Sequence, residues 1–234
     1  MNESTPTKTL LIEAAEISRS DAKTQRVLLQ NSSLSIHSSD RIGLIGPSGS
    51  GKSTLLRALA ILDRCNSGEI RFQGQLIQDD AVPRFRRQVV YLPQRASFVA
   101  STVRENLRIP FQLSSSQTEF DEAKAISLLS QFGRSPDLLE QQVSELSGGE
   151  QQIVALVRTI SLDPLVILFD EPTASLDAAS ADQFEQMVNQ WHSEDQARAL
   201  IWTSHDHTQV DRMSSRVIEI QEGHIISASP EALS

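Results

Sequence analysis

Cysteines, aromatic side chains and long hydrophobic runs are all scarce in this chain of 234 residues. Its single cysteine, Cys65, cannot form an internal disulfide, and no Cys/His cluster has zinc spacing, so we expect a reducing compartment and no structural metal. The chain has 8 Phe, 2 Trp and 1 Tyr, none of them before Phe72. The most apolar run, residues 165–169, is far shorter than the roughly 20 residues of a membrane helix. If this protein acts at a membrane, we expect another protein to span it.

Basic residues are also in deficit. Lys and Arg total 21 against 30 Asp and Glu, which gives a formal charge of −9 and a pI near 5.0. Proteins that bind nucleic acid need clustered Lys and Arg to neutralise phosphates, so we expect no nucleic-acid partner. The polar N-terminus, MNESTPTKTL, lacks the apolar segment of a signal peptide, and we expect the chain to stay in the cytoplasm. The length suits one domain over residues 1–234.

Short apolar segments alternate with helix-like stretches and predict an α/β fold. The expected buried parallel strands cover residues 41–46, 88–93, 165–170 and 199–204. Two earlier stretches, 9–18 and 26–36, predict an antiparallel β region at the N-terminus. Helices are expected over 52–63, 119–133 and 178–196, and a helical insert over about 95–160. In open α/β sheets ligands bind at the carboxyl ends of the strands, so the polar residues that follow these strands are the candidate site.

A glycine-rich loop follows the first predicted parallel strand. It matches G-x-x-x-x-G-K-[ST] and comprises Gly46, Pro47, Ser48, Gly49, Ser50, Gly51, Lys52, Ser53 and Thr54. Its glycines let backbone N–H groups surround phosphate oxygens, and the N-terminus of the next helix adds positive potential. Lys52 would reach the β- and γ-phosphates, and the Ser53 hydroxyl would bind Mg²⁺. The loop therefore predicts ATP and Mg²⁺ binding.

Polar residues follow three further strands. Asp170 and Glu171 end the apolar run LVILFDEP, where two carboxylates need a counter-charge such as Mg²⁺. We predict that Asp170 acts at the metal, as a ligand or through a group bound to it, and that Glu171 orients and polarises the attacking water. Gln94 could hold both Mg²⁺ and that water, and His205 could donate to the γ-phosphate. A structural role for a single strand-end histidine is the alternative.

A second glycine motif, LSGGE, begins the stretch 146–161. Ser147 and Glu150 have the spacing of a capping box, so a well-capped helix is one interpretation. That interpretation leaves Gly148 and Gly149 unexplained, because glycine weakens the first turn of a helix. Bare N–H groups at a helix N-terminus form an anion site. Ser147 could therefore both cap the helix and bind phosphate.

Taken together, the phosphate loop, Gln94, LSGGE, LVILFDEP, SLD (175–177) and His205 resemble the ATPase subunits of ABC transporters in order and spacing. The resemblance implies a P-loop NTPase core with a helical insert that carries LSGG. It also implies a head-to-tail dimer in which Ser147, Gly148 and Gly149 contact the γ-phosphate held by the partner copy. Asp177 would couple the two sites. We expect a homodimer.

Two departures from the family concern the nucleotide site. The aromatic residue that usually stacks on adenine is missing from residues 17–28, so adenine selectivity should be reduced. Arg19 or Arg26 could stack in its place by the guanidinium plane. Ile153 stands where an arginine is usual, and a polar contact at that position is not expected.

The resemblance leaves two classes of function. One is the ATPase of a transporter, bound at the inner face of the membrane to a separate permease; the other is a soluble ABC-class ATPase. The short interval between the phosphate loop and LSGG, without heptads, and the acidic pI favour the transporter. The sequence of residues 86–107 most resembles that of iron-export ATPase subunits. Phosphate-import ATPases are the next most similar group. Residues 95–107 are expected to line the permease groove, with Phe98 and Val99 exposed there or buried in the insert.

Overall fold

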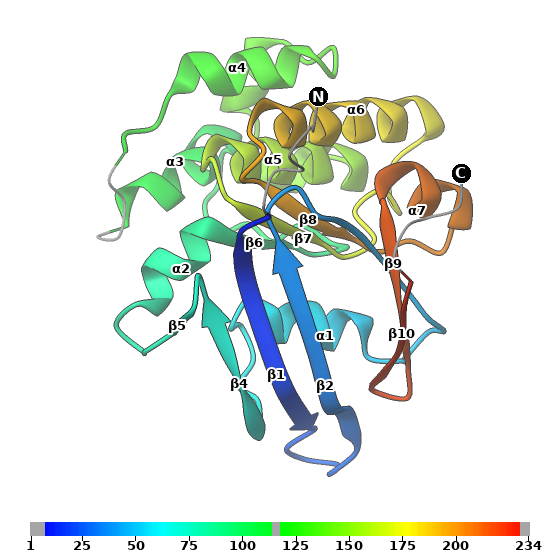
Figure 1. The fold of residues 1–234 in the computed structure, drawn as a ribbon. Coiled ribbons are helices and arrows are strands. Elements are labelled where there is room, and N and C mark those ends of the chain that lie inside the picture. The colour runs from blue at the N-terminus through cyan, green and yellow to red at the C-terminus, as the bar shows by residue number, and fades with distance from the viewer. Residues whose placement is uncertain (1–7, 114–117, 230–234) are drawn as a thin grey trace, which may run out of the picture.

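The computed structural model describes residues 8–113 and 118–229 and contains two β-sheets and a layer of helices (Figure 1). The strands are β1 (Leu10–Ser20), β2 (Val27–His37), β3 (Arg41–Ile45), β4 (Ser67–Phe72), β5 (Gln75–Leu76), β6 (Val89–Leu92), β7 (Val166–Phe169), β8 (Ala199–Trp202), β9 (Arg216–Gln221) and β10 (His224–Ser229). The helices are α1 (Lys52–Leu59), α2 (Val82–Gln88), α3 (Val103–Gln112), α4 (Glu122–Ser130), α5 (Gly148–Ser161), α6 (Ala178–Glu194) and α7 (His207–Met213), with 3₁₀ turns at Pro136–Glu140 and Val143–Glu145.

The smaller sheet is antiparallel and has the order β2-β1-β4-β5. Its long β1–β2 pair places Ile12 opposite Ile36 and Ala14 opposite Leu34. All four of these side chains are buried, while Ser33 and Ser35, which alternate with Leu34 and Ile36 along β2, are not, as expected of a sheet with one face on the core. The expected antiparallel region at the N-terminus is present.

The larger sheet has the order β10-β9-β3-β8-β7-β6. Its strands β9, β3, β8, β7 and β6 are parallel to their neighbours, and β10 pairs antiparallel with β9. Every residue of β7 and β8 is buried, which explains their continuous apolar sequences. Because β6, β7 and β8 are adjacent and parallel, the residues that follow them emerge at one edge of the sheet.

Two hydrophobic cores lie on the two faces of the larger sheet. One contains residues of α1, including Leu55 and Leu56, together with residues from both sheets. The other joins the helices to the opposite face, with Leu129 of α4, Val154 of α5 and Trp202 of β8 among its members. Figure 1 shows the helices α3–α6 gathered on one side of this sheet and the β1–β2–β4 sheet on the other. Within the ranges 8–113 and 118–229, no helix is both long and apolar enough to cross a bilayer.

Two helices end earlier than the sequence predicts, and a residue with left-handed backbone lies shortly after each of them. The helix expected over 52–63 ends at Leu59, and Ile61 has a φ of 53° just beyond it. The helix expected over 119–133 is shorter at both ends: Asp121 caps it and Gly133, with a φ of 66°, follows it. A residue with positive φ ends a helix. When that residue is not glycine, side-chain periodicity seldom predicts where the helix ends.

Candidate functional site

The glycine-rich loop runs from the end of β3 to the start of α1, as expected. Gly46, Gly49 and Gly51 have φ values of 146°, 76° and 112°, which side chains rarely allow. A Cβ on Gly46 would lie 2.1 Å from the carbonyl oxygen of Ile220, and one on Gly51 would lie 2.7 Å from that of Leu28. The loop is therefore pressed against β2 and β9, and its shape requires glycine.

Lys52 is buried inside its own loop. Its Nζ donates hydrogen bonds to the carbonyl oxygens of Gly46, at 2.7 Å, and Pro47, at 3.2 Å. The Ser50 hydroxyl is also buried and has no hydrogen-bond partner among the described residues. No side chain caps α1, whose N-cap is Gly51. A cation, an unpaired hydroxyl and free N–H groups thus meet at one helix N-terminus, a combination that suits a polyphosphate.

A pocket of about 420 Å³ lies beside this loop. It is lined by Arg26, Val27, Leu28, Pro47, Ser48, Gly49, Ser50, Glu222 and Gly223. Ser53, at the start of α1, has an exposed side chain and Thr54 a half-buried one. The exposed Ser53 hydroxyl can reach a ligand that the loop holds.

Asp170 is buried directly after β7 and hydrogen-bonded on both oxygens. The Tyr91 hydroxyl donates to Oδ2 over 2.8 Å, and the Thr203 hydroxyl lies 3.4 Å from Oδ1. Burial, followed by the hydrogen bond to Asp170, raises the pKa of Tyr91, so the phenol remains a donor. Sequence reasoning missed both partners, although each lies within a segment that it had assigned to a strand.

The structure brings Gln94, Glu171 and His205 together. Oε2 of Glu171 accepts a hydrogen bond from Gln94 Nε2 at 3.1 Å, and Oε1 lies 2.8 Å from His205 Nε2. The three residues follow β6, β7 and β8, which are neighbours in the larger sheet. Glu171 itself has a φ of 47°, and its backbone N–H donates to the Thr203 hydroxyl over 2.8 Å. A non-glycine residue in this conformation costs energy, so the surrounding contacts hold it there.

This arrangement can perform acid–base chemistry. One carboxylate is contacted from both sides, by the Gln94 amide and the His205 ring, at the edge of the sheet where the loop of β3 also ends. A carboxylate in such a setting can accept a proton from a water molecule and align it for attack.

LSGGE begins α5 with the capping box that the sequence predicts. The Ser147 hydroxyl donates to Glu150 Oε2 over 2.8 Å and accepts from the Glu150 N–H over 3.2 Å. Hydrogen bonds from the backbone N–H and then the hydroxyl of Ser147 lower the pKa of Glu150. Arg134, which sequence reasoning missed, pairs with Glu150 Oε1 at 3.1 Å. The capping interpretation is therefore correct, and the Ser147 side chain remains exposed.

The two glycines of LSGGE lie against the loop that contains Asp177. The Ser175 hydroxyl is 3.4 Å from the carbonyl oxygen of Gly148, and a Cβ on Gly149 would lie 3.2 Å from the Ser175 carbonyl oxygen. Asp177 caps α6 by accepting from the Ser180 N–H at 2.8 Å. In the described part of the chain, no hydrogen bond or ion pair joins residues 46–54 to residues 147–150. One chain thus carries two separate groups of predicted site residues.

Phe98 and Val99 have different surroundings. Phe98 is half-buried against the helical core, with the Arg158 guanidinium 5.2 Å from its ring centre, whereas Val99 is 81% exposed. Ile153 is buried in the same core, so an apolar side chain suits this position.

Comparisons with known proteins agree with this geometry. The model of the ABC transporter family matches residues 29–174. The probable iron export ATP-binding protein FetA of Escherichia coli (strain K12) is 32% identical over 194 residues, which cover 83% of this chain and 84% of FetA. The molybdenum import ATP-binding protein ModC of Methylococcus capsulatus is 36% identical over 190 residues, or 80% of this chain and 52% of ModC. The chain thus spans most of FetA but about half of ModC.

Solved structures of cassettes share the fold. A dimeric post-hydrolysis state of the ATP-binding cassette MJ0796, bound to ADP and Pi, superposes with a TM-score of 0.83 at 25% identity, over 96% of this chain and all of that one. A bacterial Atm1-family ABC exporter with ATP bound gives a TM-score of 0.78 at 24% identity, over 97% of this chain and 41% of the exporter. The mixed α/β architecture with a separate antiparallel sheet is thereby confirmed.

Proposed function

This chain belongs to the ABC transporter family and is an ATPase of that family, and from this premise we propose that it powers solute movement through a separate integral membrane permease. The main structural support for ATP hydrolysis is that Gln94 and His205 both contact Glu171 at one edge of the sheet, with Glu171 in the middle.

The phosphate loop would hold ATP through Gly46–Thr54. Lys52 already binds two carbonyl oxygens inside the loop and would exchange them for phosphate oxygens, while the unpartnered Ser50 hydroxyl gains an acceptor. Oxygen donors suitable for Mg²⁺ are present in Ser53, Gln94 and Asp170, which fit the ion that such ATPases use. When bound, Mg²⁺ would neutralise charge on the phosphates.

Hydrolysis would depend on Glu171 as the group that orients water and takes its proton. The Gln94 amide fixes one carboxylate oxygen, and His205 fixes the other. His205 would also donate to the γ-phosphate, because its side chain is 62% exposed and can leave Glu171. Thr203 keeps the backbone of Glu171 in its left-handed conformation, which aims the side chain at the sheet edge.

A second copy of the chain would complete each site. The group at LSGG, with Ser147, Gly148 and Gly149, is not bonded to the phosphate loop of its own chain and would face the phosphates held by the partner copy. Asp177 lies beside it and would couple the two sites. The dimeric MJ0796 cassettes support this arrangement.

The permease would bind near residues 95–107, with the chain on the cytoplasmic face of the membrane. Val99, in the segment between Gln94 and α3, is the most exposed large hydrophobic side chain of the described residues. A single exposed valine is ordinary on a protein surface, so the position of this contact rests on the family resemblance of residues 95–107.

For the solute we propose a metal ion, with iron export as the first hypothesis. FetA is matched over most of its length, whereas the molybdenum importer ModC is matched over about half. The macrolide export protein MacB of Azoarcus sp., 33% identical, is covered over 35% of its length. Import of phosphate or another small solute, and a soluble ATPase without a permease, are the alternatives.

The test is purification from membranes followed by ATPase assays of the complex. We expect an integral membrane protein to co-purify and to make hydrolysis solute-dependent. Iron salts, phosphate, molybdate and a macrolide would be compared, and a Val99→Asp variant should lose the membrane protein while hydrolysing ATP alone. Recovery of the chain without any membrane protein, in both variants, would remove the transporter assignment and leave the soluble ATPase.

A further inference from the structure

The pocket beside the phosphate loop contains no aromatic side chain in its lining. A nucleotide whose phosphates occupy the loop must place its base near the loop's flank, and this pocket of about 420 Å³ lies there. Its walls instead offer a cationic group, Arg26, and an apolar group, Val27, from the start of β2. Glu222 and Gly223, from the β9–β10 turn, also line the pocket.

Val27 and Arg26 are both available for a ligand. Val27 is 49% exposed, although most large hydrophobic side chains of the described residues are covered. The Arg26 guanidinium has neither a hydrogen-bond nor an ion-pair partner within residues 8–113 and 118–229. It lies close to the loop, because a Cβ on Gly49 would be 3.9 Å from its terminal nitrogen.

The backbone that carries Arg26 is fixed, although its side chain is free. The Arg26 carbonyl accepts from the Asp21 N–H at 2.8 Å, and the Asp21 carboxylate accepts from the Thr24 N–H at 2.7 Å and the Thr24 hydroxyl at 2.9 Å. These contacts close the turn between β1 and β2. A guanidinium on a fixed turn is preorganised, so binding a base would cost little ordering of the backbone.

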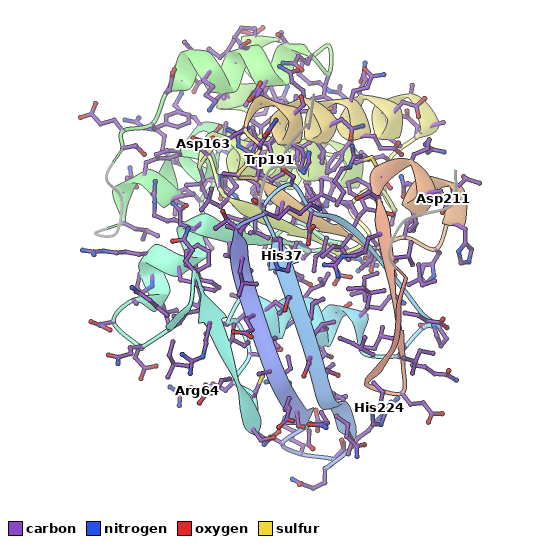
Figure 2. The ribbon with its side chains drawn as sticks, viewed as in Figure 1. His37, Arg64, Asp163, Trp191, Asp211 and His224 are labelled. Carbon is purple, nitrogen blue, oxygen red and sulfur yellow. The ribbon has the colours of Figure 1, made fainter. Side chains whose placement is uncertain are left out.

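The side chain of Arg19, the other arginine considered for base stacking, is bound by residues outside the pocket. It donates to the Arg64 carbonyl oxygen at 2.5 Å and lies 3.4 Å from the Asp63 carboxylate. Figure 2 shows Arg64 and His224 on opposite sides of the β1–β2 ribbon, and His224 belongs to the hairpin whose turn lines the pocket. Arg19 is not among the residues that line the pocket, and Arg26 is the arginine that can meet a base.

We propose, on the basis of the ATPase function above, that Arg26 stacks its guanidinium plane on the nucleobase, with Val27 beside it, and that the site accepts purine nucleoside triphosphates with little preference between adenine and guanine. A guanidinium binds the π-face of any base and does not read the edge where adenine and guanine differ. Glu222 accepts hydrogen bonds only, and both purines carry an exocyclic amino group that can donate one.

Calorimetry with ATP, GTP and inorganic tripolyphosphate separates base contact from phosphate contact. We expect wild-type affinities for ATP and GTP to agree within about tenfold. Arg26→Ala should weaken both nucleotides by about 3- to 30-fold, the range of a cation–π contact, while tripolyphosphate binding stays within about twofold. Arg26→Tyr should restore ATP binding. Arg19→Ala, the matched control, should leave nucleotide affinity unchanged.

Three outcomes would overturn the proposal. Equal weakening of ATP and tripolyphosphate by Arg26→Ala would place Arg26 on the phosphates, and no weakening would remove it from the site. A preference for ATP over GTP well above tenfold would show that another group reads the base. Failure of the wild-type chain to bind either ATP or tripolyphosphate would instead contradict the proposed ATPase site itself, and melting curves would show whether each variant is folded.

Discussion

The Nε2 atom of His205 lies 2.8 Å from the Oε1 atom of Glu171, across the ends of two neighbouring parallel strands. The contact ties the position of a carboxylate to that of a histidine 34 residues later in the chain, and Gln94 holds the same carboxylate from the other side. The geometry makes Glu171 the centre of the predicted chemistry, because each of the other two residues reaches it and not one another.

Replacing Glu171 by Gln should nearly stop hydrolysis without abolishing ATP binding. The amide keeps the size of the side chain but cannot take a proton from water, so turnover should fall by about 10²- to 10⁴-fold. Phosphate release measures turnover, and sedimentation should reveal a trapped dimer with two nucleotides. Glu145→Gln, at an exposed acid, is the control. Near-normal hydrolysis by the Glu171 variant would remove Glu171 from this role.

Replacing Lys52 by Ala should reduce ATP affinity. The charged hydrogen bonds of Lys52 to phosphate would be lost, at about 1.5–3 kcal/mol for one such bond, or about 10- to 150-fold in affinity. The Gly46 and Pro47 carbonyls would also lose their donor, so the variant should melt at a lower temperature. Calorimetry measures binding, with exposed Lys23→Ala as the control. Unchanged ATP affinity would overturn the phosphate-loop assignment.

Replacing Ser147 by Arg should separate nucleotide binding from dimerisation. Among the residues that the structure describes, no hydrogen bond or ion pair joins Ser147 to residues 46–54 of the same chain, so each monomer should still bind ATP. A long side chain at this position would block contact with a partner's phosphates. Sedimentation with ATP should show monomers. Ser147→Ala is the control, since it removes the cap of α5, at about 1 kcal/mol, without adding bulk. Normal ATP-driven dimers of Ser147→Arg would refute the shared site.

Asp40 should make stability depend on pH without affecting ATP affinity. Its carboxylate is buried and accepts from the His37 N–H, Lys8 and Arg216, each at 2.9 Å. Burial acts to raise the pKa of Asp40, but these partners outweigh it and the net pKa is lowered. The resulting stabilisation is therefore present at neutral pH and is lost as the pH falls through the lowered pKa.

Asp40→Asn tests this dependence. The variant should be less stable than wild type at pH 7, by about 1–3 kcal/mol, and the difference should shrink in acid. Urea unfolding at several pH values measures it. A difference that is independent of pH would show that the carboxylate charge contributes nothing.

The strand ends that form the candidate site could be predicted because the motifs that mark them are short and contiguous in the sequence. Gly46 and Gly51 occupy fixed positions in a short motif, and the apolar runs before Gln94, Glu171 and His205 mark buried parallel strands. Adjacent parallel strands then bring the three residues together, and this geometric rule held.

The features that the sequence did not reveal depend on long-range contacts. The Tyr91 contact with Asp170 joins two segments that are far apart in the chain. Nothing in the sequence around either residue indicates that the other is its partner. The Lys52 contacts with loop carbonyls arise from backbone conformation, which side-chain patterns do not encode. The different surroundings of Phe98 and Val99 follow from how residues 95–102 turn before α3.

The contacts behind the phosphate loop have a consequence for biosynthesis. Gly223 N–H donates to the Ser50 carbonyl oxygen at 2.8 Å, and β3 pairs with β9, so the loop is supported by residues far downstream of it in the sequence. A nascent chain on the ribosome would contain the complete glycine motif long before β9 and the β9–β10 turn, which support the loop, have been synthesised. Bound nucleotide should therefore assist folding of this loop only after residues 216–223 have been synthesised, and truncation before residue 216 should yield a chain that carries the motif and binds no ATP.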